Sequence, residues 1–369
     1  MNAHNGTYDR SRFDDGLQLS YNARDSTLTV RSTSGGNPDR VEERLRFPIR
    51  VVAEITSRCN MRCTYCSQGG NPRGDSIPTD AIFRIIDDAD RYRAFKLSLR
   101  GAEALLHPDF KQIWDHAVSK EFISTDLVTN GILLTEQRAL SMLENGRSRI
   151  VVSLDGPDAI NSESRNPHQY TKVMKWLLPV LRQKPDQITV VTTAFRHNYG
   201  HIPEFAAYLC GLGLRHYNIS LLKRLGRATQ DLGFLSSGEI YRLEESLAAI
   251  AIASPLFAPV ISTPFFTEDR DMYANVPIQL FSDYFCGSGM KIMVDGRIGI
   301  SQMIHFDSLS ESEHADRYHK DRNCLGRISD RKSLQQIWLE NDALRRAQAR
   351  RAKKNFRYMI GLESQLGSE

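Results

Sequence analysis

The chain has 369 residues, 41% of them hydrophobic and 25% charged, with 48 Lys and Arg against 44 Asp and Glu. This apolar content is sufficient for a buried core and excludes wholesale disorder, while a net charge of +4 gives no indication of a protein that coats nucleic acid. The longest apolar run, 247–253, is far shorter than the roughly 20 residues that cross a bilayer, and residues 1–12 lack a signal-peptide pattern. We therefore expect a soluble, cytoplasmic protein that binds neither nucleic acid nor membranes.

Residues 1–47 are polar and predict a small N-terminal appendage. Two short runs of alternating polar and apolar residues, 17–21 and 27–30, could pair as a β-hairpin across the turn at 23–25. After residue 47, strand-like apolar runs begin to alternate with stretches of helical periodicity. We therefore place the start of the next domain at residue 48.

Residues 48–254 alternate strand-like apolar runs with stretches of helical periodicity. A parallel crossover needs an intervening helix, so six successive β-then-α units predict a parallel sheet. We expect a partial (β/α)6 TIM-like barrel, an α/β fold with its chemistry at the carboxyl ends of the strands. The expected strands are 51–55, 95–99, 123–129, 150–154, 188–193 and 217–222. The expected helices are 81–89 with Thr79 as N-cap, 109–122, 136–143 with Thr135 as N-cap, 170–181, 202–212 and 237–252.

Residues 255–369 break this rhythm and predict an α+β C-terminal region. A hairpin is indicated at 291–294 and 297–300 across Asp295-Gly296, and a helix at 333–341. The basic stretch 345–354 could dock a leader peptide or an electron donor, but we interpret it as a solvated helical face.

Three of the six cysteines, Cys59, Cys63 and Cys66, lie on one loop directly after the first strand of the barrel. A structural zinc site normally closes with a fourth protein ligand, and no second Cys-x-x-Cys pair follows here. A thioredoxin-like interpretation of Cys63 and Cys66 leaves Cys59 unexplained. Three thiolates on a four-iron–four-sulfur cluster leave one iron free for a substrate or cofactor, so a catalytic cluster is the favoured hypothesis.

The Cys-x3-Cys-x2-Cys loop, with the aromatic Tyr65 before its last cysteine, resembles the radical S-adenosylmethionine (SAM) superfamily. The segment 99–103, Leu-Arg-Gly-Ala-Glu, resembles the family's Gly-Gly-Glu segment, with Ala102 in place of the second glycine. Segments 127–131 and 153–157, together with Arg165, resemble the ends of the third and fourth strands. The likeness covers about residues 50–230, and its motifs occur in the family's order.

This resemblance implies one [4Fe–4S] cluster on the cysteine triplet and SAM as the second cofactor. Reduction of the cluster would cleave SAM into methionine and a 5′-deoxyadenosyl radical that abstracts a substrate hydrogen. The residues implied in SAM binding are Glu103 for the amino group, Arg165 for the carboxylate, Ser153 and Asn130 for the ribose, Tyr65 for the adenine edge, and Gly101 with Ala102 for close backbone approach.

The C-terminal region resembles a degenerate SPASM or twitch extension. Cys286 and Gly296 fit the opening of that extension, but Ser301 stands where a second cysteine is expected. Segments 325–328 and 334–338 also resemble it. Cys286 and Cys324 supply only two of the four ligands of an auxiliary cluster, so we expect none, although His305 or His314 could complete a site.

The absence of an auxiliary cluster would favour a redox-neutral reaction, such as epimerisation, rearrangement or elimination. Epimerisation needs a thiol that returns hydrogen, for which Cys286 is our preferred candidate and Cys210 a second one. The leading hypothesis is tailoring of a sugar-, aminoglycoside- or nucleoside-type natural product with a flavodoxin or ferredoxin as electron donor. The alternatives are maturation of a ribosomally made precursor peptide and, from another class, a non-catalytic metal-binding scaffold.

Overall fold

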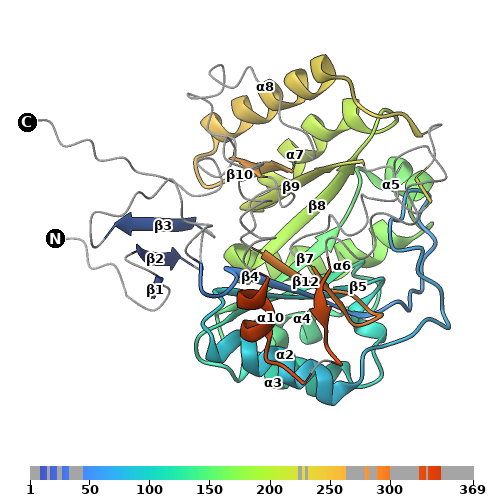
Figure 1. Cartoon of the computed structure of the whole chain (residues 1–369). Helices are drawn as coiled ribbons and strands as arrows, with labels where there is room; N and C mark the ends of the chain where they lie inside the picture. The colour runs from blue at the N-terminus through green and yellow to red at the C-terminus, as the bar shows by residue number, and fades with distance from the viewer. Residues whose placement is uncertain are drawn as a thin grey trace, which may run out of the picture.

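A long curved parallel sheet with helices around its outside dominates the computed structural model (Figure 1). The structure describes residues 9–14, 17–22, 27–32, 45–222, 227–228, 232–262, 279–281, 289–299, 324–329 and 331–341. Within them, eleven strands form one open sheet in the order β11-β10-β9-β8-β7-β6-β5-β4-β12-β13-β14. Among the helices of this described part, none is both long and apolar enough to cross a membrane.

Six consecutive strands of this sheet confirm the predicted β/α body. Neighbouring strands in this set pair in parallel throughout, and the sheet does not close into a full barrel. The strands are β4 (Arg50–Thr56), β5 (Lys96–Gly101), β6 (Ser124–Thr129), β7 (Ser148–Ser153), β8 (Ile188–Ala194) and β9 (His216–Leu221).

The connecting helices bury one apolar stripe each against the sheet. In α2, for example, Ile82, Ile85, Ile86 and Ala89 recur at helical spacing and are buried. Predicted and observed helices correspond: α2 (Thr79–Arg91), α3 (Phe110–Val118), α4 (Glu136–Met142), α6 (Gln169–Gln183), α7 (Ile202–Gly211) and α8 (Ser237–Ala253). The short helix α5 (Asp158–Ser164) was not predicted.

The two predicted helix caps differ in outcome. Thr135 caps α4 as expected, because its side chain accepts a hydrogen bond from the Arg138 backbone N–H. The N-cap prediction for Thr79 was wrong. Thr79 is the first helical residue of α2, and its hydroxyl donates to Asp109 Oδ2 at 2.5 Å, so the side chain joins two helices instead of capping one.

The sheet extends beyond the predicted six strands on both sides. On the β9 side it continues through β10 (Ala258–Ser262) and β11 (Gln279–Phe281), which are parallel and were not predicted. On the β4 side, β12 (Gly289–Ile292) and β13 (Arg297–Gly299) form the predicted antiparallel hairpin. The unpredicted β14 (Cys324–Arg327) pairs with β13, and the predicted helix α10 (Leu334–Glu340) follows it.

The N-terminal appendage is a three-stranded antiparallel sheet of β1 (Asp9–Asp14), β2 (Leu17–Asn22) and β3 (Thr27–Ser32). Pairing of β2 with β3 confirms the predicted hairpin, whereas β1 was missed. Buried Arg12 attaches this sheet to the barrel, because its guanidinium donates to the carbonyls of Phe47, Pro48 and Arg93. The appendage therefore packs against the body of the protein.

A buried ion pair joins the C-terminal hairpin to the first strand of the barrel. Lys291 Nζ on β12 lies 2.7 Å from Glu54 Oε1 on β4, and both side chains are only 2% exposed. Gln68, just past the cysteine triplet, also donates to Glu54 Oε1. The pair therefore links the C-terminal region, β4 and the cysteine loop.

We expect Lys291→Met to lower the free energy of unfolding by about 3–5 kcal/mol, because it removes the cation from a buried carboxylate. Urea unfolding measures this loss. The double variant Lys291→Met/Glu54→Leu should recover most of it, since an apolar pair of similar volume replaces the ion pair. A single variant as stable as the wild type would show that the pair does not hold β12 in place.

Candidate active site at the carboxyl edge of the sheet

The cysteine loop leaves the carboxyl end of β4 and is held by segments that follow other strands. Thr64 N donates to the Ser164 carbonyl at 2.9 Å, which ties the loop to the end of α5. Arg227, beyond β9, makes two hydrogen bonds to the cysteine loop. Its backbone N donates to Cys66 O and its Nε donates to Cys63 O, both at 3.0 Å. Sequence reasoning missed Arg227, which lies in no motif.

The three thiols of the loop lie close enough to influence one another electrostatically. Burial raises the pKa of Cys59 to about 11, with smaller contributions from the charges of Glu103, Cys63 and Cys66. Burial also raises the pKa of Cys63, whereas the positive charges of Arg165 and Arg227 lower it. Without a metal, the thiols of Cys59 and Cys63 are therefore stabilised in their neutral form, and a cationic centre would be needed to favour their thiolates.

The donor set of this loop fits an iron–sulfur cluster better than a closed zinc site. Three soft sulfur donors come from one short loop, and no fourth cysteine among the described residues lies beside them. Within the described ranges, no three His, Cys, Asp or Glu side chains are already placed to hold a metal ion.

Glu103 lies at the carboxyl end of β5 and is 1% exposed. Its Oε1 accepts hydrogen bonds from Thr129 Oγ1 at 2.7 Å and Leu105 N at 3.2 Å, and its Oε2 accepts one from Asn130 N at 2.7 Å. Burial raises the pKa of this carboxyl group, while these donors lower it. Glu103 thus joins the ends of β5 and β6, and its contact with the amino group of SAM stays a prediction.

Gly101 and Gly70 provide the close backbone approach on which the cysteine loop depends. At Gly101, with φ of +153°, an added Cβ would lie 2.2 Å from the Thr56 carbonyl oxygen. The close approach is therefore to strand β4. At Gly70, an added Cβ would lie 2.5 Å from Ala102 Cβ and 2.8 Å from Cys59 Cβ.

We expect Gly70→Ala to reduce iron incorporation, because the new methyl group displaces Cys59 or Ala102. Adding Ala102→Gly should restore part of the loss, since it removes the closer of the two clashes. Gly200→Ala is the matched control, as an added Cβ there meets nothing within 4 Å. Iron per chain after anaerobic reconstitution measures the effect, and equal loading of all three variants would contradict the argument.

Asp155 is the centre of the polar network beside the cysteine loop, and sequence reasoning missed it. This fully buried carboxylate accepts hydrogen bonds at Oδ2 from Tyr65 Oη at 2.5 Å and from Ser164 Oγ and Arg165 Nε, both at 2.8 Å. The signal was present in the sequence, because Asp155 lies in the quoted segment 153–157 just after β7.

This network fixes the charges of two predicted SAM-binding residues. Burial raises the pKa of Tyr65 well above its usual value, so the phenol stays protonated and donates to Asp155. Burial lowers the pKa of Arg165, but the Asp155 carboxylate outweighs this effect and the pKa lies above its ordinary value. Arg165 uses its Nε for Asp155, which orients the guanidinium that we predict to bind the SAM carboxylate.

Asn130 and Ser153 also lie at the carboxyl edge, at the ends of β6 and β7. Asn130 Nδ2 donates to Asn60 Oδ1 in the cysteine loop at 2.8 Å. Gln169 Nε2 donates to the carbonyls of Asn130 and Ser153, at 2.7 and 2.8 Å. The structure thus brings together the triplet and all seven residues predicted to bind SAM, and their contacts with the cofactors stay predictions.

The other predicted thiols are not all at this edge. Cys210 is in the last turn of α7, which leads back to the amino end of β9, and it packs against the apolar core. The structure therefore does not bring Cys210 to the triplet, as a hydrogen donor requires. Cys324 is on β14, where its thiol donates to the Gly326 carbonyl. Cys286, Ser301, His305, His314 and the basic stretch 345–354 lie outside the described residues.

Fold and site together define an open β/α barrel with a thiol-rich loop at the carboxyl edge of its sheet. Residues 53–209 match the model of the radical SAM superfamily, so this part of the chain belongs to that superfamily. The superfamily's cofactors, a [4Fe–4S] cluster and SAM, are those of this domain.

The chain is similar to several characterised proteins. It is 28% identical over 173 residues to the mycofactocin maturase MftC of Mycobacterium ulcerans, which covers 46% of each chain. It is 25% identical over 291 residues to AlbA, the antilisterial bacteriocin subtilosin biosynthesis protein of Bacillus subtilis, which covers 77% of this chain and 58% of AlbA. The chain spans about half the length of the curated relatives it matches.

Among solved structures, the fold resembles that of SuiB from Streptococcus suis in complex with the precursor peptide SuiA. The TM-score is 0.57 at 17% identity, with 79% of this chain and 72% of SuiB covered. At this identity the likeness shows the fold alone. The open parallel sheet with its flanking helices is therefore a shared architecture, which confirms the predicted fold class.

Proposed function

We propose that this chain is a radical SAM enzyme that modifies a precursor peptide. The observation that carries the proposal is the thiol triplet held at the carboxyl edge of the sheet beside Glu103 and Arg165. When bound, the cluster supplies the electron that cleaves SAM into methionine and the 5′-deoxyadenosyl radical, which removes a hydrogen atom from the substrate. An external electron donor reduces the cluster, and the chain's own residues bind and orient the reactants.

Those residues position the reactants and keep the charges fixed. Cys59, Cys63 and Cys66 would hold the cluster. Glu103 would accept a hydrogen bond from the amino group of SAM, and Arg165, oriented by Asp155, would donate to its carboxylate. The low exposure of Glu103 and Asp155 strengthens these interactions, because little water competes with them.

The peptide substrate class replaces the leading hypothesis of a sugar- or nucleoside-type substrate. AlbA, whose match reaches 77% of this chain, takes part in the biosynthesis of a bacteriocin, and the fold of SuiB accommodates a precursor peptide. These relatives support the peptide alternative. A redox-neutral modification with Cys286 as hydrogen donor stays a hypothesis about a residue outside the described ranges.

The substrate class is tested with the full chain, reconstituted anaerobically and reduced. Short peptides encoded beside its gene are added one at a time with SAM, and nucleosides and aminosugars serve as the comparison set. The proposal predicts that a peptide increases 5′-deoxyadenosine formation and itself changes in mass or in α-carbon configuration. Turnover that responds to the small molecules but to no peptide would reverse the assignment.

A further inference from the structure

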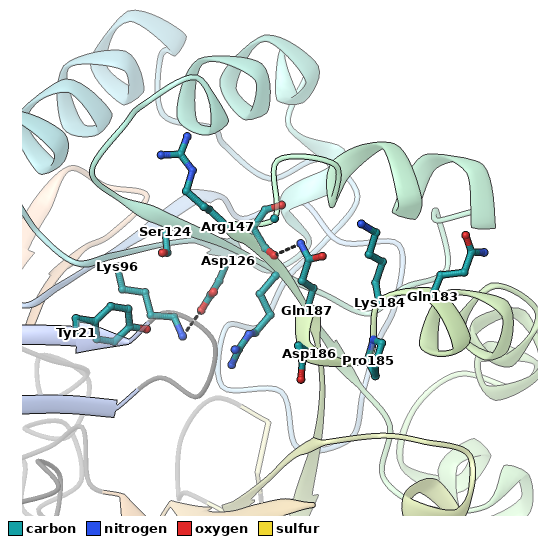
Figure 2. A pocket seen from close by; sticks show the side chains of 13 residues that line it. Tyr21, Lys96, Ser124, Asp126, Arg147, Gln183, Lys184, Pro185, Asp186 and Gln187 are labelled. Atoms are coloured by element: carbon teal, nitrogen blue, oxygen red, sulfur yellow. Dashed lines mark hydrogen bonds and ion pairs between the residues drawn. The ribbon is translucent and has the colours of Figure 1, made fainter. Parts of the chain in front are cut away.

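A cavity of about 330 Å³ lies at the amino edge of the sheet, and Figure 2 shows the side chains that line it. The cysteine loop follows the carboxyl end of β4, at the other end of the strands. Lys96 and Ser124 are the first residues of β5 and β6, and Tyr21 of the N-terminal sheet closes the cavity from the side. Strands of six residues separate the two sites by about 20 Å. The volume suits a small molecule, and no part of the proposed reaction uses this cavity.

The wall of the cavity carries more positive than negative charge. Both of its carboxylates are already engaged, because Asp126 lies 2.9 Å from Lys96 Nζ and Asp186 lies 2.6 Å from Arg215 Nη1. Figure 2 shows the Lys96–Asp126 contact within the cavity. Against these two carboxylates stand four lining cations: Lys96, Arg147, Arg149 and Lys184.

The pKa values of two neighbouring side chains, His216 and Arg10, also reflect the positive charge around the cavity. His216, the first residue of β9, has its pKa lowered to about 3 by burial and by the charges of Arg149, Lys96 and Arg215, which outweigh Asp186. The pKa of Arg10 is lowered to about 10 by burial and by the charge of Arg147. Asp90 opposes the effect on Arg10, but among the described residues that line the cavity the cations outnumber the carboxylates by two.

Ser124 adds a hydrogen-bond donor without an acceptor. The residue is 5% exposed and lines the cavity, yet within the described part of the chain its Oγ has no hydrogen-bond partner. A buried hydroxyl without a partner is costly, and native proteins usually satisfy such groups. The Oγ atom is itself covered in this structure, so an oxygen of a bound ligand would complete this hydrogen bond after the Ser124 side chain turns toward the cavity.

We propose that this cavity binds a small phosphate dianion, either inorganic phosphate or the phosphate group of a small monoester. Two excess positive charges match a dianion. Arginine side chains offer paired donors that suit phosphate oxygens, and Ser124 supplies a further donor. Because Tyr21 belongs to the N-terminal sheet, the bound anion also contacts that appendage and holds it against the barrel.

The test is thermal unfolding and calorimetric titration of the full chain with inorganic phosphate or glycerol 3-phosphate, at constant ionic strength set with chloride. We expect a saturable rise in melting temperature with phosphate and no such rise with chloride. The probe that binds more tightly identifies the free anion or the monoester as the preferred form. Failure of both probes to bind at millimolar concentration would overturn the proposal.

Two variants and a control make the assignment specific. Arg149→Gln should weaken binding about tenfold or more. Ser124→Ala should weaken it about fivefold while leaving the melting temperature without phosphate equal or higher, because it removes an unsatisfied hydroxyl. Lys175→Gln, an exposed charge on α6, should bind as the wild type does. Unchanged affinity in both cavity variants would contradict the site, whatever the activity of the enzyme.

Discussion

A Cys63→Ala variant is expected to lose nearly all of its cluster iron and all formation of 5′-deoxyadenosine. Three thiolates are the minimum that holds the cluster while leaving one iron open, and no other cysteine of the described residues lies beside the loop. Iron and sulfide analysis after anaerobic reconstitution should fall from about four of each per chain to near zero.

The control for this variant is Cys210→Ala. Cys210 packs against the core at the far end of α7, so its removal should leave the iron content unchanged and cost only a modest part of the stability. If Cys63→Ala kept a full complement of iron, the assignment of the triplet as cluster ligands would be wrong.

The second large effect is expected for Asp155→Asn. This substitution keeps the shape of the side chain but removes the negative charge that faces buried Arg165, whose side chain is 8% exposed. Breaking such a buried pair costs about 3 kcal/mol or more in free energy of unfolding. Because Arg165 and Tyr65 then lose their anchor, SAM should bind about tenfold more weakly, equivalent to ~1.4 kcal/mol.

Urea unfolding and equilibrium SAM binding measure these two losses separately. Asp158→Asn is the matched control, because it removes an exposed carboxylate three residues further on, at the start of α5. Its SAM affinity should equal that of the wild type. Cluster content should stay normal in both variants. Full SAM affinity in Asp155→Asn would show that Arg165 does not depend on Asp155 for its position.

The local sequence was enough to predict the six central strands, because each one contains a short run of apolar residues that is buried on at least one face. In β4, Val51, Ala53 and Ile55 are all fully buried. Strands β10, β11 and β14 were missed because their local sequence shows no such apolar run of sufficient length. They are three to five residues long, and their place is set by pairing with distant segments, as in β10 beside β9.

The residues of the candidate site likewise differ in whether they could be predicted from local sequence. Glu103 and Asn130 were predicted because their segments resemble motifs of the radical SAM superfamily, each at the end of a strand that the apolar pattern predicts. Asp155 and Arg227 were missed, since their importance comes from contacts across the fold. Glu103 and Tyr65 lie at the carboxyl edge of the sheet, and no local pattern could reveal that other residues of the chain already occupy their polar atoms.

The most direct test of the account needs no substrate. The reconstituted wild-type protein is reduced under anaerobic conditions, mixed with SAM alone, and assayed for 5′-deoxyadenosine. If one iron of the cluster has no ligand from the protein and binds SAM, we expect release of this nucleoside and of methionine in equal amounts. A protein that carries its full iron and binds SAM, yet releases neither product under strong reductant, would contradict the central claim.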